Sequence, residues 1–171
     1  MLKNIGNFSN SADYLPLLNG VLITDLFVIL LLNINVIKSN VLRKWYSQYN
    51  LSAVIADVLI ILIGLIITRA IYYYLFETFS LFKFTILAVV VQIIHDILFY
   101  IFFSTMPRGV NKMVDTFKDY ANEVSYKAIF ADSIMMIMSC LIASYLVNKS
   151  MNINIIVLIS FLYLLPYLLY N

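Results

Sequence analysis

The sequence has few charged residues, one cysteine and one histidine, and these shortages exclude several classes of protein. Only 12% of its 171 residues are charged, whereas 63% are hydrophobic and the mean hydropathy is +0.94. Soluble domains carry roughly a quarter charged residues, so this chain lacks the charge that a water-exposed surface requires. The net charge of +2 comes from dispersed basic residues, which weighs against nucleic-acid binding. The composition predicts a membrane protein.

The single cysteine and the single histidine narrow the chemistry further. Cys140 lies in an apolar segment without a second cysteine, which excludes an intrachain disulfide and a cysteine zinc site. One histidine, His95, excludes the multi-histidine iron clusters of membrane desaturases. Because no catalytic signature is present either, the sequence weighs against an enzyme, and we expect no cofactor.

Five apolar stretches follow a polar N-terminal segment at residues 1–14. Each is close to the roughly 20 residues that cross a bilayer as an α-helix. The stretches cover residues 15–37, 51–74, 81–103, 127–147 and 151–170. The sequence therefore predicts an all-α fold, a polytopic membrane helix bundle with five transmembrane helices in a single domain at residues 15–171.

Lysine and arginine residues set the expected orientation, because cytoplasmic loops are enriched in both. One side of the membrane receives Lys38, Arg43, Lys44, Arg108, Lys112, Lys118 and Lys127. The other side receives Lys3, Arg69, Lys83 and Lys149. We therefore predict that the first side is cytoplasmic, with the N-terminus outside and the C-terminus inside.

The polar stretch between the third and fourth spans has the pattern of an amphipathic helix at about residues 107–124. Its apolar positions recur at helical spacing, and they are Val110, Met113, Val114, Phe117, Ala121 and Val124. Such a helix lies in the headgroup region of the inner surface, or it docks a partner or gates a passage. Trp45, Tyr46 and Tyr49 before the second span are interpreted in the same way, as an anchor at the membrane interface.

Ionisable residues inside the spans are the most informative feature, because a charge in the bilayer costs several kcal/mol unless it is paired or hydrated. Asp57, Asp96 and Asp132 each lie about 8 to 10 Å from the inner end of a span, counting about 1.5 Å per residue. Asp25 is nearer the middle of the membrane and is a lesser candidate. The candidate ion or proton site residues are Asp57, Gln92, His95, Asp96, Asp132 and Ser133.

Three interpretations of this cluster remain open. In the first, protonated aspartates and a neutral histidine form hydrogen bonds between helices and only fix the packing. In the second, the carboxyl groups retain protons or bind a cation, as in a small channel or transporter. In the third, Asp57, His95, Asp96 and Asp132 bind a divalent metal in a membrane enzyme. We rank them in that order.

A short internal echo links two of the aspartates. Residues 53–57, AVIAD, resemble residues 128–132, AIFAD, at a distance of 75 positions. Both segments begin a span from the inner side. The echo predicts two parallel helical hairpins, an arrangement that places a site at the interface between repeats.

Several segments resemble a family of uncharacterised multi-pass membrane proteins encoded by large DNA viruses that infect algae and protists. These segments are Trp45 with Tyr46, residues 51–68, the QIIHDILFY sequence at 92–100, the MPRG sequence at 106–109, and residues 117–138. The resemblance implies a location in the internal membrane of a virion or in a host membrane, and it implies no activity or catalytic residue. It favours a structural or scaffolding protein whose partners are the lipid bilayer, further copies of the chain, or other membrane or capsid proteins. A viroporin-like channel is the alternative.

Overall fold

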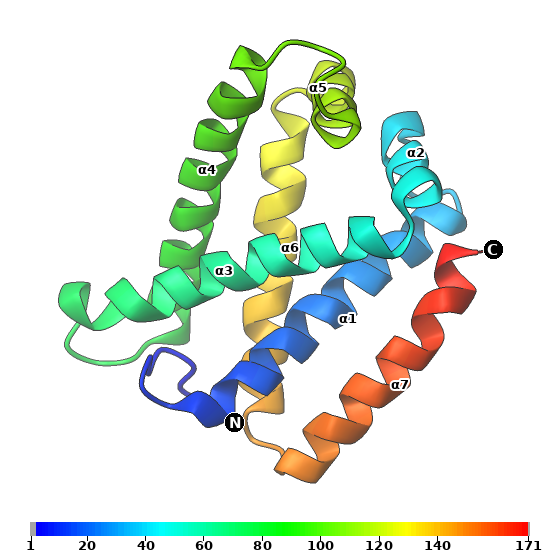
Figure 1. Ribbon diagram of the computed structural model, residues 1–171. Helices are drawn as coiled ribbons and strands as arrows, with labels where there is room; N and C mark the ends of the chain where they lie inside the picture. The colour runs from blue at the N-terminus through cyan, green and yellow to red at the C-terminus, as the bar shows by residue number, and fades with distance from the viewer. Residues whose placement is uncertain (1–2, 171) are drawn as a thin grey trace.

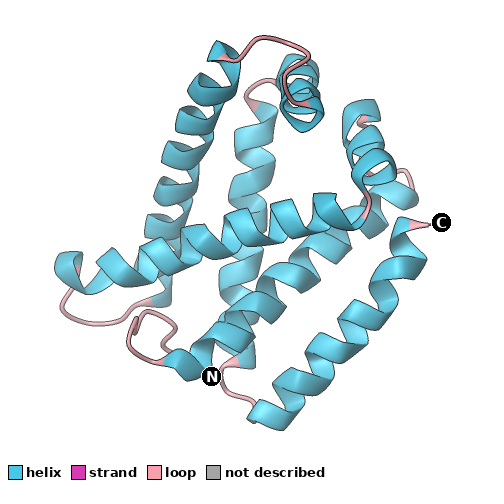
Figure 2. Cartoon of the chain, viewed as in Figure 1, coloured by secondary structure: helices cyan, strands magenta, loops and turns pink. Residues whose placement is uncertain are grey.

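The computed structural model describes residues 3–170, which form seven α-helices and a short 3₁₀ helix and contain no strand (Figure 1, Figure 2). The 3₁₀ helix is η1 (Ser11–Asp13). The α-helices are α1 (Tyr14–Asn33), α2 (Asn40–Tyr49), α3 (Leu51–Leu75), α4 (Leu81–Thr105), α5 (Lys112–Val124), α6 (Lys127–Leu146) and α7 (Met151–Leu169).

Five of these helices are long and apolar enough to cross a membrane. They are α1 together with η1, then α3, α4, α6 and α7. Their apolar side chains point outward as well as inward, and Ile63 and Ile156 are 54% and 62% exposed. A helix that is apolar on all sides suits a lipid surrounding. The predicted all-α bundle with five spans is confirmed.

The segment after the first span differs from the sequence prediction, because it is a helix and not only an interfacial anchor. Helix α1 ends at Asn33, and Asn35 turns the chain with a positive φ of 62°. Ser39 then begins α2, and its hydroxyl oxygen accepts a 3.0 Å hydrogen bond from the backbone N–H of Leu42. This side-chain cap satisfies a backbone donor that the first turn leaves free.

Helix α5 confirms the amphipathic prediction but begins later than residue 107. Asn111 caps it, and the side-chain oxygen accepts hydrogen bonds from the backbone N–H groups of Met113 and Val114 at 2.9 and 3.2 Å. Gly109 precedes the cap with a φ of 88°, a conformation that most other residues avoid. The turn at Gly109 thus occupies the residues that periodicity alone assigned to the helix.

Helices α2 and α5 contact each other at one end of the bundle, and we call this pair the platform (Figure 1). The carboxylate of Glu123 in α5 accepts hydrogen bonds from the Ser39 hydroxyl at 2.6 Å and from the Val41 backbone N–H at 3.1 Å. The rings of Trp45 and Phe117 pack with centroids 4.8 Å apart. The platform is therefore held by polar contacts at one edge and by aromatic contacts at the centre.

The first six α-helices form two units with the same order of elements, a long helix, an amphipathic helix and a long helix: α1–α2–α3 and α4–α5–α6. In each unit, a residue with positive φ joins the amphipathic helix to the following long helix: Asn50 at 47° and Ser125 at 50°. Asp57 follows Asn50 by seven positions, and Asp132 follows Ser125 by the same number. Across the units α1 contacts α6 and α3 contacts α4, and within them α1 contacts α3 and α4 contacts α6. The two similar sequence segments thus begin the third helix of each unit.

Helices α1 and α6 approach each other closely in the bundle core. A Cβ atom added at Gly20 would lie 2.8 Å from the backbone oxygen of Ser139 and 2.9 Å from the backbone nitrogen of Ala143. Small residues allow such an approach between membrane helices. This contact joins the first unit to the second.

The end of the bundle away from the platform is tied together by Arg69 of α3, which is 1% exposed. Its guanidinium group donates hydrogen bonds to the carbonyl oxygens of Asn7 and Asn10, the latter at 2.9 Å, and lies 3.4 Å from the Asp13 carboxylate. The polar N-terminal segment therefore folds back onto the bundle.

Candidate functional site

Two aspartates inside the long helices accept hydrogen bonds from adjacent residues of the platform. The Trp45 indole N–H donates to Oδ2 of Asp57 in α3 at 2.9 Å. The Tyr46 hydroxyl donates to Oδ1 of Asp25 in α1, also at 2.9 Å. Trp45 and Tyr46 are only 4% and 5% exposed, so both donors are buried. Helix α2 is thus fastened to both long helices of its own unit.

These contacts change the roles that the sequence assigned to the four residues. Trp45 and Tyr46 are not exposed interfacial anchors, because their polar groups point to carboxyl groups inside the bundle. Asp25, the lesser candidate in the sequence, is fully buried and accepts a hydrogen bond from Tyr46. The position of each aspartate along its helix does not reveal these hydrogen bonds. They form because α2 folds back over α1 and α3 and brings the Trp45 and Tyr46 donors to the carboxyl groups.

The second unit holds a different polar arrangement, and most of it lies within α4. Oδ1 of Asp96 accepts a 2.7 Å hydrogen bond from the Gln92 side chain and lies 3.2 Å from Nδ1 of His95. The His95 ring stacks on Phe99 with centroids 5.7 Å apart. The structure therefore brings Gln92, His95 and Asp96 together, as their spacing predicts, but on one helix.

Asp132 and Ser133 in α6 have separate environments. The Ser133 hydroxyl donates a 2.7 Å hydrogen bond to the carbonyl oxygen of Ile129 in its own helix. Asp57, Asp96 and Asp132, which were expected at one depth, lie on three different helices, α3, α4 and α6. Within residues 3–170 no hydrogen bond joins one of these three carboxyl groups to another.

The pKa values of two platform tyrosines are raised by burial and by these carboxyl groups. Burial raises the pKa of the Tyr46 phenol, and the nearby carboxyl groups of Asp57 and Asp25 raise it further. Burial also raises the pKa of the Tyr120 phenol, with Asp132 as the largest charged contributor. Both phenols therefore keep their protons at neutral pH, and Tyr46 remains a hydrogen-bond donor.

Two carboxyl oxygens within the long apolar helices lack a hydrogen-bond donor although they are buried. They are Oδ2 of Asp25 and Oδ2 of Asp96, one in each structural unit. A buried polar atom without a partner is uncommon in native proteins, and at functional sites such atoms bind a proton, a water molecule or an ion. Among the described residues, however, no group of three or more His, Cys, Asp or Glu side chains could hold a metal ion. Asp57, His95, Asp96 and Asp132 do not converge as a metal site.

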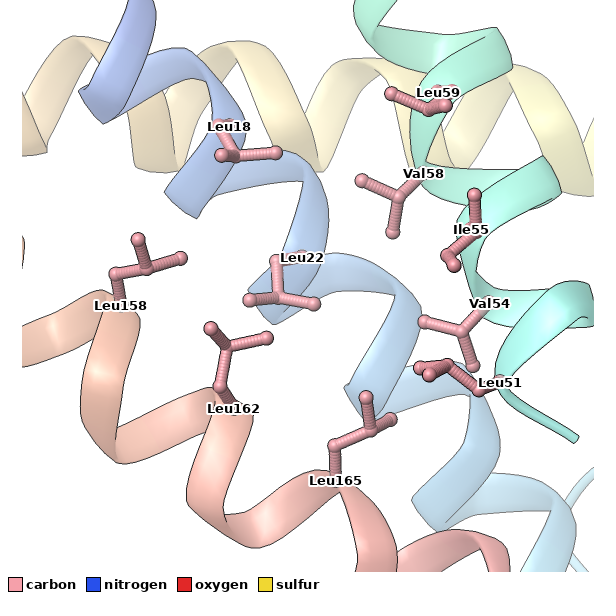
Figure 3. A pocket seen from close by; sticks show the side chains of 10 residues that line it. All are labelled: Leu18, Leu22, Leu51, Val54, Ile55, Val58, Leu59, Leu158, Leu162 and Leu165. Carbon is pink, nitrogen blue, oxygen red and sulfur yellow. The ribbon is translucent and has the colours of Figure 1, made fainter.

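An apolar hollow of about 250 Å³ lies between α1, α3 and α7, and no aspartate is among its lining residues (Figure 3). Figure 3 shows aliphatic side chains around it, among them Leu22 of α1, Val58 of α3 and Leu162 of α7. All of its lining residues are leucine, isoleucine or valine. The hollow therefore offers no group that could bind an ion or take part in catalysis.

Neither a protein-family model, nor a curated protein, nor a solved structure matches this chain.

Proposed function

We propose that the protein is a structural component of a membrane, in which five spanning helices hold the platform in a fixed position. The observation that carries this proposal is the pair of hydrogen bonds from Trp45 to Asp57 and from Tyr46 to Asp25. Each aspartate has its own donor, and the two donors are neighbours on one short helix. This is the pattern of residues that fix packing, because each carboxyl group stabilises one contact between helices.

Hydrogen bonds also join the two helices of the platform, α2 from the first unit and α5 from the second. Glu123 joins α5 to the first turn of α2, and the Tyr49 hydroxyl lies 3.0 Å from the Thr116 hydroxyl. A carboxylate at a helix N-terminus is favoured by the positive end of the helix dipole. Contacts between its two helices thus support the platform as a surface on which other components assemble.

We further propose that the platform lies on the cytoplasmic side, with the N-terminus outside and the C-terminus inside. The excess of lysine and arginine at this end supports the orientation. Labelling cysteines from each side tests it, using Lys112→Cys in the platform and Asn7→Cys at the opposite end, both at exposed positions. A Cys140→Ala background removes the native cysteine. An outside reagent should label only the cysteine at position 7, and labelling only at position 112 would reverse the orientation.

The resemblance to membrane proteins of large DNA viruses supports a narrower form of this proposal. In that form, the chain belongs to the internal membrane of a virion or to a host membrane, and the platform contacts further copies, other membrane proteins or capsid proteins. Fractionation of infected cells and of purified virions, followed by detection of the chain, tests this location. Its absence from both membranes would contradict this narrower form.

Passage of protons or small ions is the second candidate function. The specific observation in its favour is that Asp25 and Asp96 each have a buried oxygen without a donor. Carboxyl groups inside a bilayer are typical of proton relays and ion pathways.

Flux measurements in proteoliposomes distinguish the two candidates. The scaffold proposal expects no flux from the wild-type protein under an imposed potential or pH gradient. It also expects Asp57→Asn to fold normally, because asparagine keeps an oxygen that accepts from Trp45. Wild-type flux that Asp96→Asn and Asp132→Asn both abolish, with folding intact, would contradict the scaffold and establish passage.

A further inference from the structure

A second hollow, of about 190 Å³, lies where α4 ends and α5 crosses above it. The last turns of α4 contribute Tyr100, Phe103 and Ser104, and the loop that follows contributes Arg108. Helix α5 contributes Lys118 and Asn122. Unlike the aliphatic hollow beside α7, this one combines two cationic side chains, a hydroxyl and an amide with two aromatic rings.

The two cationic groups keep donors that the protein does not use. Arg108 makes one hydrogen bond, from Nη1 to the Asp119 carboxylate at 2.9 Å, and these side chains are 54% and 37% exposed. An exposed ion pair of this kind contributes little and is readily exchanged for another partner. The ammonium group of Lys118 donates to the carbonyl oxygen of Met106 and retains two further N–H groups. The hollow is therefore positively charged and has free donors.

The position of the hollow indicates what kind of anion it suits. Helix α4 ends its apolar run at Thr105, so Arg108 lies just beyond the end of a membrane span. The Tyr100 ring lines the hollow and is 55% exposed, and the ring of Phe102, nearby on α4 but outside the hollow, is 56% exposed. A soluble phosphate would use only the polar part of this site. A lipid would use both parts, with its phosphate beside Arg108 and its hydrocarbon against the aromatic rings.

We propose that this hollow binds the phosphate headgroup of an anionic phospholipid. Arg108 supplies the planar donor fork that matches phosphate oxygens, and Lys118 supplies a second positive charge. Basic pockets at the ends of membrane helices recognise anionic headgroups by this chemistry. The site lies in the second structural unit, its lining residues do not include Asp25, Asp57, Asp96 or Asp132, and the proposal does not rest on the scaffold function proposed above.

Lipid retention by the full-length protein tests the site. The protein is purified in detergent with phosphatidylglycerol or with phosphatidylcholine, and the lipid that remains bound is measured by native mass spectrometry. The wild-type protein should retain phosphatidylglycerol in preference. Arg108→Gln and Lys118→Gln should each weaken this retention about fivefold, since each basic residue near a membrane surface contributes about that factor. Lys112→Gln, an exposed lysine of the same helix, removes the same charge outside the hollow and should leave retention nearly unchanged.

A variant that increases binding excludes loss of folding as the explanation. Asp119→Asn removes the carboxylate that pairs with Arg108, so it should strengthen phosphatidylglycerol retention. Three results would overturn the proposal. The first is an equal effect of Lys112→Gln and Lys118→Gln, which would indicate diffuse attraction. The second is unchanged retention in Arg108→Gln. The third is displacement of the lipid by inorganic phosphate at similar concentration, which would identify a soluble anion as the ligand.

Discussion

The indole N–H of Trp45 and the carboxyl group of Asp57 form a 2.9 Å hydrogen bond that crosses from the platform to α3. Trp45 is the only tryptophan in the chain, and it is almost completely buried. Its ring also packs against Phe117 of the other platform helix. One side chain therefore links α2 to a membrane-embedded carboxyl group and to α5 at once.

We predict that Asp57→Leu destabilises the protein by about 1 to 3 kcal/mol, because it leaves the Trp45 N–H buried without an acceptor. Asp57→Asn should cost less, since its amide oxygen still accepts. Thermal unfolding in detergent, followed by circular dichroism, measures both. In a double-mutant cycle, Asp57→Leu should lower the free energy of unfolding clearly less in a Trp45→Phe background than in the wild-type protein. Additive effects of the two substitutions would show that the hydrogen bond contributes nothing to stability.

The close contact between α1 and α6 predicts that alanine is tolerated less well at Gly20 than at Gly64. Gly20→Ala should destabilise the protein by about 1 to 3 kcal/mol, because its Cβ would meet backbone atoms of Ser139 and Ala143 and force the helices apart. Gly64→Ala should change stability by less than about 1 kcal/mol, because its nearest neighbour is the flexible end of Met136 at 3.1 Å, and alanine favours the helix. Equal effects at both positions would show that α1 and α6 are not in close contact.

Glu123 should contribute to stability through the cap it provides for α2. Glu123→Gln keeps one acceptor oxygen but removes the charge that favours a helix N-terminus, so we expect a loss of about 0.5 to 1.5 kcal/mol. Glu77→Gln serves as the control, because Glu77 is exposed in the loop between α3 and α4. Comparison of the two unfolding midpoints gives the result, and equal midpoints would argue against the bond between α5 and α2.

The stability of the protein should decrease at alkaline pH partly through Tyr46. Its pKa in the folded protein is raised by burial and by Asp57 and Asp25, above the value of about 10 that an unfolded tyrosine has. The unfolded chain therefore loses this proton first, and the stabilisation present below about pH 10 is lost as the pH rises further.

Unfolding midpoints measured across this pH range test the prediction for Tyr46. Tyr46→Phe should flatten the alkaline decrease, although it is less stable at neutral pH because Asp25 loses its donor. Tyr74→Phe, at a side chain that is 89% exposed, should leave the profile unchanged. An identical slope in Tyr46→Phe and in the wild-type protein would contradict the assignment.

Most of the fold could be predicted from hydropathy because the spans are long and apolar. The predicted span 51–74 and the observed α3 differ by one residue at the end. Helix α2 was missed as a helix although its signal is present. Ser39 suits an N-cap, and Val41, Leu42, Trp45 and Tyr46 recur at helical spacing. Because α2 has only ten residues and lies between two much longer apolar runs, its helical spacing does not stand out in the hydropathy pattern.

The candidate site was less predictable, for a physical reason. Gln92 and Asp96 are one turn apart, and their hydrogen bond follows from helix geometry alone. The contacts of Asp25 and Asp57 depend on how the platform folds back over the bundle, and no local spacing encodes that. The sequence thus identifies a carboxyl group whose burial is unfavourable in free energy, but only the structure identifies the group that donates a hydrogen bond to it.

The repeated unit of two long helices and one amphipathic helix has a topological consequence. A unit with two crossings begins and ends at the same end of the bundle, so a second unit joined in tandem keeps the same direction without inverting. Duplication of such a unit is compatible with one membrane orientation, whereas duplication of a unit with an odd number of crossings reverses the second copy. Helix α7 adds the fifth crossing outside the repeat, and this crossing alone separates the two chain ends (Figure 1).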